Sequence, residues 1–201
     1  MASCSSGVSL CQNADAKKFV SWLIEEDEEM VFAIDGGNFG RPLSASAVQK
    51  WWDDKDSFFM DQRGWKTLEY RIFDIVVDAQ ACGHIEVGVF SGVDVERNVA
   101  TAHCGVGTCF GWLLYVYTLP SSRGKGIGME AVVAACKEAI KLGASSTLLI
   151  VQESNFRARR FYERVGFSDT GKSMMRNGCK FNLIEYKTSS HRQELVEELD
   201  T

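Results

Sequence analysis

The chain has 201 residues, enough for one compact domain with short tails. Its net charge of −5 disfavours nonspecific nucleic-acid binding, and without a run of about 18 apolar residues no membrane span is expected. The seven cysteines form no CxxC pair, and Cys104 and Cys109 have no histidine at metal-ligand spacing. We therefore expect free thiols, no metal and a cytoplasmic location.

The first half of the chain predicts two helices and several strands. Residues 1–12 are expected to form a disordered tail, and a helix is predicted from about Asp15, with Phe19, Trp22 and Leu23 on one face. A serine cap at residue 44 or 46 suggests a second helix. Strands are expected over Val31–Ile34, Leu68–Val77, His84–Phe90 and Phe110–Leu119, with a turn at Cys82-Gly83 and a connection over Asn98–Gly107.

The second half is more regular. A helix is predicted over Gly126–Leu142, because its apolar residues recur at helical spacing and Gly143 follows. A buried strand should follow at Thr147–Val151, then a helix from Asn155 to about Val165 and a strand over Lys180–Lys187. We expect one domain over residues 13–187, with residues 188–201 as a tail or a short helix.

A glycine-rich segment, residues 120–128 (PSSRGKGIG), joins a predicted strand to a predicted helix. Glycine adopts conformations that other residues avoid and lets the backbone approach a ligand closely. Consecutive N–H groups at a helix start attract phosphate, and Arg123 and Lys125 add positive charge. The segment therefore predicts a pyrophosphate site, although a tight strand-to-helix turn would use the same residues. Its spacing is not that of a P-loop and fits the dinucleotide fingerprint poorly.

A second motif, residues 155–167 (NFRARRFYERVGF), begins the following helix. Asn155 and Tyr162 are seven residues apart, about two helical turns, and therefore share a face. Taken singly, Asn155 is explained as an N-cap and Tyr162 as a core aromatic. Their joint occurrence roughly 30 residues after the glycine-rich segment is much less expected by chance.

Together the two motifs resemble the signatures of the GNAT superfamily of N-acetyltransferases. The RxxGxG/A signature matches Arg123, Gly126 and Gly128. The NxxAxxFYxxxGF signature matches Asn155, Ala158, Phe161, Tyr162, Gly166 and Phe167. A looser similarity of residues 15–23, 36–44 and 83–85 resembles the branch that acetylates ribosomal-protein N-termini.

The resemblance implies an α/β (α+β) fold, with a mixed, splayed sheet of about six to seven strands flanked by about four helices. It implies that acetyl-CoA is the co-substrate and that its pantetheine arm lies between the strand before the glycine-rich segment and the next parallel strand. A bulge is expected in the first of these strands. By the same resemblance, the acetyl and pantetheine part contacts Val116, Tyr117 and Thr118, and the pyrophosphate contacts Arg123, Gly124, Lys125, Gly126, Ile127, Gly128 and Met129.

The expected chemistry is direct attack of an amine on acetyl-CoA. The resemblance places Asn155 on the pantetheine arm and Tyr162 near the thioester sulfur. With an ordinary pKa near 10, Tyr162 stays protonated at neutral pH and is the predicted general acid. Backbone groups near Tyr117 are expected to polarise the acetyl carbonyl.

The general base is not identified by the sequence. Many amine-acetylating relatives have a glutamate five residues before the motif asparagine, where this chain has Ile150. The other candidates are Glu86, His84, His103 and Tyr115. Neutralising a lysine at pH 7 costs about 4–5 kcal/mol and neutralising an α-amine about 1 kcal/mol, so an α-amine is the easier acceptor without a strong base.

The predicted partner is therefore an amine-bearing small molecule or a protein N-terminus, with no nucleic acid and no membrane; a homodimer stays open. The alternatives are a non-catalytic acyl-CoA-binding or interaction module with the same fold and a nucleotide-binding protein, which the second motif disfavours.

Overall fold

Seven strands form one mixed sheet, in the order β1-β2-β3-β4-β5-β7-β6, in a computed structural model of the chain. The structure describes residues 7–12, 17–24, 26, 44, 46, 50, 53–54, 59–60, 63–96 and 98–187. The strands are β1 (Ser9–Gln12), β2 (Trp65–Val77), β3 (Gln80–Gly92), β4 (Cys109–Thr118), β5 (Thr147–Gln152), β6 (Ser168–Arg176) and β7 (Cys179–Tyr186). Neighbouring strands are antiparallel except β4 and β5, which run parallel.

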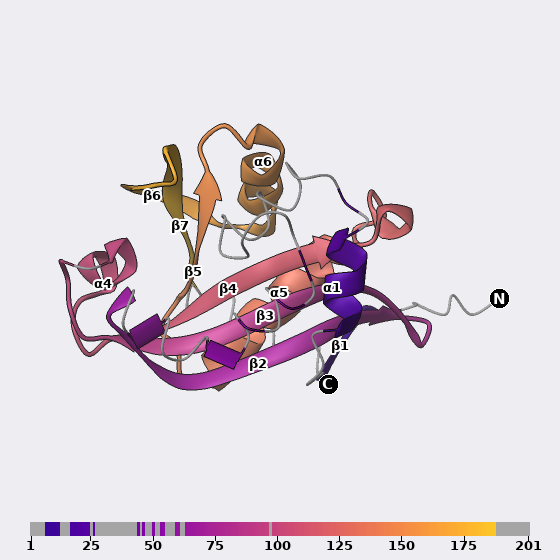
Figure 1. The fold of residues 1–201 in the computed structure, drawn as a ribbon, viewed down its shortest axis with the longest axis horizontal. Helices are drawn as coiled ribbons and strands as arrows, with labels where there is room; N and C mark the ends of the chain where they lie inside the picture. Colours follow the sequence, from indigo (N-terminus) through magenta and orange to yellow (C-terminus); the bar gives the residue numbers. More distant parts are fainter. Residues whose placement is uncertain are drawn as a thin grey trace.

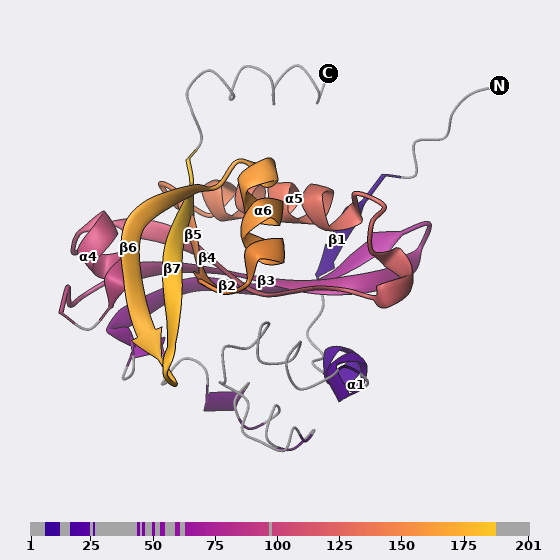
Figure 2. The same cartoon turned by 90° about the horizontal axis from the view of Figure 1, so that it is seen from above.

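Helices lie on both faces of this sheet (Figure 1, Figure 2). Helix α1 (Lys17–Ile24) is on one face, and α5 (Ile127–Lys141) and α6 (Phe156–Val165) are on the other. The short α4 (Val99–Cys104) lies beyond one end of the long strands, and a 3₁₀ turn, η1 (Pro120–Ser122), follows β4. The described part of the chain thus has seven strands and four α-helices, which confirms the predicted α+β fold with a mixed sheet.

Side chains along β3 point alternately to the two faces of the sheet, and apolar side chains lie on both, so the sheet has a core on each face. Ile85, Val87 and Val89 pack toward α5, where they meet small alanine side chains of that helix. Phe90 points to the other face and joins the core beneath α1, together with Phe19. His84 and Glu86 have the parity of Phe90, so this pattern also puts them on the α1 face.

The turn between β2 and β3 differs from the prediction. Asp78 and Ala79 form it, with φ of +49° and +61°, and Val77 pairs with Gln80. Two central residues with positive φ make the type of turn that matches the twist of a hairpin. Cys82 and Gly83 lie within β3 instead. Gly83 is needed there because a Cβ would come within 2.4 Å of the Tyr117 carbonyl oxygen on β4.

Three further differences concern short or polar segments. Strand β1 corrects the expected disordered tail, since Ser9–Gln12 pairs with β2 and Leu10 packs against the core. Helix α4 replaces the expected connection because the Asn98 side chain caps it, accepting from the Ala100 amide at 2.8 Å. Strand β6 was not predicted, because it pairs only with β7 and its residues are largely polar or exposed.

Some predicted elements lie outside the described residues. These are the strand at Val31–Ile34, most of the helix from residue 44, and residues 188–201. Among the described helices, none has the length and apolar character to cross a membrane. Within the same ranges no group of three or more His, Cys, Asp or Glu side chains could hold a metal ion, and the described cysteines are free thiols.

Candidate active site

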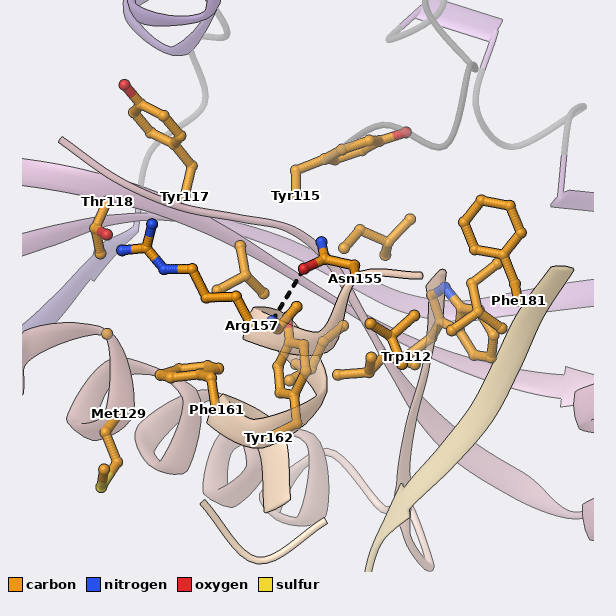
Figure 3. Close-up of a pocket in the computed structure, with 18 of the residues that line it drawn as sticks. Trp112, Tyr115, Tyr117, Thr118, Met129, Asn155, Arg157, Phe161, Tyr162 and Phe181 are labelled. Carbon is orange, nitrogen blue, oxygen red and sulfur yellow. Dashed lines mark hydrogen bonds between the residues drawn. The ribbon is translucent and has the colours of Figure 1, made fainter. Parts of the chain in front are cut away.

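A pocket opens where β4 and β5 separate. The two strands pair only at Gly111 with Thr147 and at Trp112 with Leu148. Beyond these pairs they diverge, and the space between them is part of a cavity of about 480 Å³, within the range of small-molecule sites. The splay that the resemblance implies is therefore present. Thr118 and Met129 lie toward one end of this pocket, Trp112 and Phe181 toward the other, and Asn155 and Tyr162 between them (Figure 3).

Strand β4 has a bulge where it lines the pocket. Glu86 pairs with Leu114 and His84 with Tyr117, so two residues of β4 oppose only Ile85 of β3. The first of these two, Tyr115, adopts a left-handed conformation with φ of +48°. A bulge interrupts the ladder and leaves backbone groups unpaired. Backbone groups of β4 can thus face a ligand in the segment where the acetyl group was predicted to bind.

The glycine-rich segment presents a run of free backbone N–H groups. Within the described residues, no group accepts a hydrogen bond from the amides of residues 124–128. Gly124 and Gly126 have φ of +78° and +83°, and Gly126 begins α5 without a side-chain cap. The amide of Met129 donates to the Gly126 carbonyl at 2.9 Å, so the run ends at Gly128. Such a run at the start of a helix suits a phosphate.

The guanidinium of Arg123 is occupied by protein groups. It donates from Nη2 to a carboxylate oxygen of Glu26 at 2.6 Å and from Nε to the Thr118 carbonyl at 3.0 Å. It also lies 5.6 Å from the ring centroid of Tyr117, whose hydroxyl donates to the same Glu26 oxygen at 2.8 Å. Arg123 therefore fixes the start of the glycine-rich segment, and the amides after it are left for the ligand.

Helix α6 carries the second motif along the pocket. The Asn155 side-chain oxygen caps the helix, accepting from the Ala158 amide at 3.0 Å (Figure 3). The helix ends at Gly166, with φ of +109°, where two successive amides donate to the Tyr162 carbonyl. No described residue accepts from the Asn155 Nδ2 group. One side chain thus holds the helix start and still has a donor to offer.

Tyr162 is half-buried and lines the pocket. Its ring packs edge-on against Phe161 and Phe167, with centroid separations of 5.0 and 5.5 Å. Burial raises the pKa of Tyr162 above its usual value near 10, and the Cys136 thiol adds to the rise. The hydroxyl is therefore protonated at neutral pH, as a hydrogen-bond donor must be.

Among the candidate bases, Glu86 lies close to the bulge and has a partner on each of its two carboxylate oxygens. The side chains of Glu86 and His84 are fully buried, with 2.9 Å between a carboxylate oxygen and Nε2. The Tyr70 hydroxyl donates to the other carboxylate oxygen, and the Phe19 ring stacks on His84 at 3.9 Å. His103 instead pairs with Glu185 at 3.1 Å. Of the four candidate bases, only Tyr115 lines the pocket itself; Glu86, His84 and His103 do not.

Most predicted site residues line this one pocket. They are Val116, Tyr117, Thr118, Arg123, Gly124, Gly126, Gly128, Met129, Asn155 and Tyr162. Lys125 and Ile127 do not: Lys125 is exposed, and Ile127 packs against the core on the α5 side.

Other lining residues were not foreseen. Arg63 precedes β2, and Arg176 and Phe181 belong to the β6–β7 hairpin. Residues so far apart in sequence have no shared spacing that could have paired them.

Comparison with known proteins agrees with this architecture. No sequence among the curated proteins matches the chain. The aminoglycoside acetyltransferase AAC(6')-Ib, solved with coenzyme A, has a TM-score of 0.62 at 14% identity, covering 93% of this chain and 97% of that one.

Two further solved structures have the same fold. The spermidine N-acetyltransferase of Vibrio cholerae, solved with CoA and spermine, has a TM-score of 0.60 at 15% identity, covering 94% of this chain and 99% of that one. The protein yncA of Salmonella typhimurium, solved with acetyl-CoA, has a TM-score of 0.57 at 15% identity, covering 92% and 96%. The model of the acetyltransferase (GNAT) family matches residues 43–167, more than half of the sequence, and the chain belongs to this family.

Proposed function

We propose that the protein transfers an acetyl group from acetyl-CoA to a primary amine by direct attack. The observation that carries this proposal is the pocket between β4 and β5, with free amides at one end, a bulged strand along one wall and Tyr162 between. In the reaction the amine nitrogen bonds to the acetyl carbon and the carbon–sulfur bond breaks. The amine loses one proton, and the departing thiolate takes one up.

The cofactor half of the site would be held mainly by backbone groups. The amides of residues 124–128 suit the pyrophosphate, and the bulged segment Val116–Thr118 suits the acetyl and pantetheine part. No described residue accepts from Asn155 Nδ2, and this group is the proposed donor to the pantetheine arm. Tyr162 supplies a proton or a hydrogen bond to the leaving sulfur, because its phenol stays protonated.

We propose that the Tyr70–Glu86–His84 group, on β2 and β3 beside the bulge, accepts the proton that the amine loses. Glu86 lies opposite Leu114 of β4, one residue before the bulge. The Glu86 carboxylate is buried and does not line the pocket, so the proton would have to reach it through a relay. Tyr70 donates a hydrogen bond to this carboxylate and is only partly buried, and we propose it as that relay. Ile150, an apolar pocket residue, stands where many relatives have a glutamate.

The acceptor in this proposal is a protein N-terminal α-amine or a small amine. The similarity of the first half to the branch that acetylates ribosomal-protein N-termini favours a peptide N-terminus, and the aminoglycoside and spermidine enzymes of the same fold favour small amines. An α-amine is easier to neutralise than a lysine side chain.

Thiol release from acetyl-CoA, followed against a panel of amines, tests the proposal. The panel would hold peptides with free N-termini, amino acids, polyamines and aminoglycosides, with acetylated product identified by mass. The expected result is thiol release that depends on one class of amine. Binding of CoA without turnover on any amine would support the acyl-CoA-binding module instead, the alternative that Ile150 raises.

A further inference from the structure

Glu26 reaches from the end of α1 to the cofactor end of the pocket, which is formed by residues 116–118 and 123–129. It lies two residues after the helix, where its amide donates to the Leu23 carbonyl at 3.2 Å. A carboxylate at a helix C-terminus meets the negative end of the helix dipole, so it adds nothing to the stability of α1. An acid at this position is therefore explained by its contacts with other elements.

One oxygen of the Glu26 carboxylate accepts two hydrogen bonds. Nη2 of Arg123 donates to Oε1 at 2.6 Å, and the Tyr117 hydroxyl donates to the same atom at 2.8 Å. The Arg123 guanidinium also lies 5.6 Å from the centroid of the Tyr117 ring. Hydrogen bonds to a charged group are about twice as strong as neutral ones, so the three side chains hold one another in place.

Both residues that Glu26 contacts are tied to the backbone proposed to bind acetyl-CoA. Nε of Arg123 donates to the Thr118 carbonyl at 3.0 Å, which folds the segment between them back onto β4. The run of free amides begins at the next residue, Gly124. Tyr117 belongs to the part of β4 after the bulge, where the acetyl group is proposed to bind. Glu26 thus joins the pyrophosphate part of the site to the acetyl part.

These contacts are shielded from solvent. The side chains of Glu26 and Arg123 are only 11% and 26% exposed. Tyr117 is buried, and its ring contacts Phe19 and Trp22 of α1. When one partner of a shielded ion pair is removed, the other charge is left without compensation. Without the Glu26 carboxylate, the Arg123 guanidinium would turn toward water and would no longer fix the start of the glycine-rich segment.

We infer that Glu26 is a positioning residue for acetyl-CoA, although it does not line the pocket. Its carboxylate holds the amides of residues 124–128 and the segment Val116–Thr118 in one relative position, so that a single ligand engages both at once. The inference rests on the proposed function, because it takes acetyl-CoA as the ligand. The effect of Glu26 passes through Arg123 and Tyr117 and not through a contact of its own with the ligand.

Glu26→Gln tests this inference, because it keeps the shape of the side chain and removes its charge. The Kd of CoA, measured by titration, and the KM for acetyl-CoA should both rise at least about fivefold, since the two parts of the site are no longer preorganised. An unchanged Kd would overturn the inference. A lower Kd would also overturn it, because Glu26 would then be keeping Arg123 away from the phosphates of the ligand.

A double-mutant cycle shows whether the effect passes through Arg123. Arg123→Gln alone should raise the Kd of CoA at least as much as Glu26→Gln does. In the double variant the rise should be much smaller than the product of the two single effects, because either substitution already breaks the pair. Effects that multiply would mean that Glu26 acts independently of Arg123, and this would overturn the inference.

Asp74→Asn is the matched control for a purely structural role. Asp74 on β2 pairs with Lys18 of α1 at 3.3 Å, so this ion pair also joins α1 to the sheet, and neither residue lines the pocket. The substitution should leave the Kd of CoA unchanged, whatever its effect on the thermal midpoint. A rise equal to that of Glu26→Gln would mean that any loosening of α1 weakens binding, and would overturn the specific role of Glu26. Failure of the unmodified protein to bind CoA would instead overturn the proposed function, together with the inference that depends on it.

Discussion

Burial changes what the Tyr162 hydroxyl can contribute to catalysis. With its pKa raised, the phenol is a weaker acid than a CoA thiol, whose ordinary pKa is about 8.5. Full transfer to the thiolate is then uphill, so a hydrogen bond to the developing charge is its main contribution. Tyr162→Phe should lower kcat more than about tenfold, while the Kd of acetyl-CoA changes little.

The pH dependence follows from the same shift. The neutral phenol is the active form and is lost only above its folded-state pKa, so Tyr162 should cause no fall in kcat up to about pH 10. Tyr186→Phe is the matched control, because Tyr186 packs on Phe167 outside the pocket. An unchanged kcat in Tyr162→Phe would remove this hydroxyl from the mechanism.

Glu86 can be tested by what pH does to its removal. Glu86→Gln should lower kcat/KM at least about tenfold near neutral pH, because the amine then loses its proton acceptor. The defect should shrink as the pH approaches the amine's own pKa, where the acceptor is already neutral. A defect of constant size at every pH would mean that Glu86 only shapes the site. Glu185→Gln is the control. Glu185 is also buried and paired with a histidine, His103, but neither residue lines the pocket.

Among the structural elements, α6 is held by the residue that is also proposed to bind the pantetheine arm. Asn155→Asp keeps the oxygen that caps the helix and removes the Nδ2 donor, whereas Asn155→Ala removes both. Loss of an N-cap costs about 1 kcal/mol, so Asn155→Ala should lower the thermal midpoint and Asn155→Asp should not. Both should raise the KM for acetyl-CoA. If Asn155→Asp keeps the wild-type KM, Asn155 is only a cap.

Two glycines, one at the start of α5 and one after its end, allow the effect of backbone strain to be distinguished from an effect on CoA binding. Gly126→Ala puts a Cβ on a residue with φ of +83°, at a cost of about 1–2 kcal/mol, and crowds the amides of the glycine-rich segment. Gly143→Ala carries the same kind of strain at φ of +96°, in the loop after α5 and away from the pocket. Calorimetry should find both destabilised, and titration should find CoA binding weakened only in Gly126→Ala. Equal weakening in both would mean that the glycine serves the fold alone.

The elements that could be predicted were those with long local patterns. Helices α5 and α6 have apolar periodicity and glycines just beyond their ends, and both lie within a residue or two of the prediction. The β2–β3 turn was misplaced because Ala79 adopts a positive φ, which alanine seldom does, while Gly83 has a packing role. Strand β6 forms by pairing with β7, and the hydrophobic pattern of a single segment does not predict which strand it pairs with.

The site divides in the same way. The glycine-rich segment, Asn155 and Tyr162 lie in local motifs, so the sequence alone could bring them together. Arg176 and Phe181 line the same pocket as these motifs only because the sheet order puts the β7–β6 hairpin beside β5. This part of the pocket therefore depends on topology, which one sequence does not reveal.

At the scale of the whole molecule, Glu26 joins the two halves of the chain. It follows α1 and contacts Arg123 and Tyr117, which belong to the cofactor end. The side chains of Glu26 and Arg123 are only 11% and 26% exposed, so their bond is better shielded from solvent than a surface ion pair. A ligand at the glycine-rich segment should therefore stabilise both sides of the sheet as one unit.

This coupling predicts how the folded state responds to its ligand. CoA at about 100 times its Kd contributes about 2.7 kcal/mol to the free energy of unfolding. For a domain of this size, that should raise the Tm by about 5–10 °C in one cooperative transition, measured by scanning calorimetry. NAD and ATP at the same concentration are the controls and should change the Tm little, because the glycine-rich segment has neither the dinucleotide nor the P-loop spacing. A larger shift with NAD or ATP than with CoA would mean that the amides of residues 124–128 bind another nucleotide. The gap between β4 and β5 would then not be a pantetheine site.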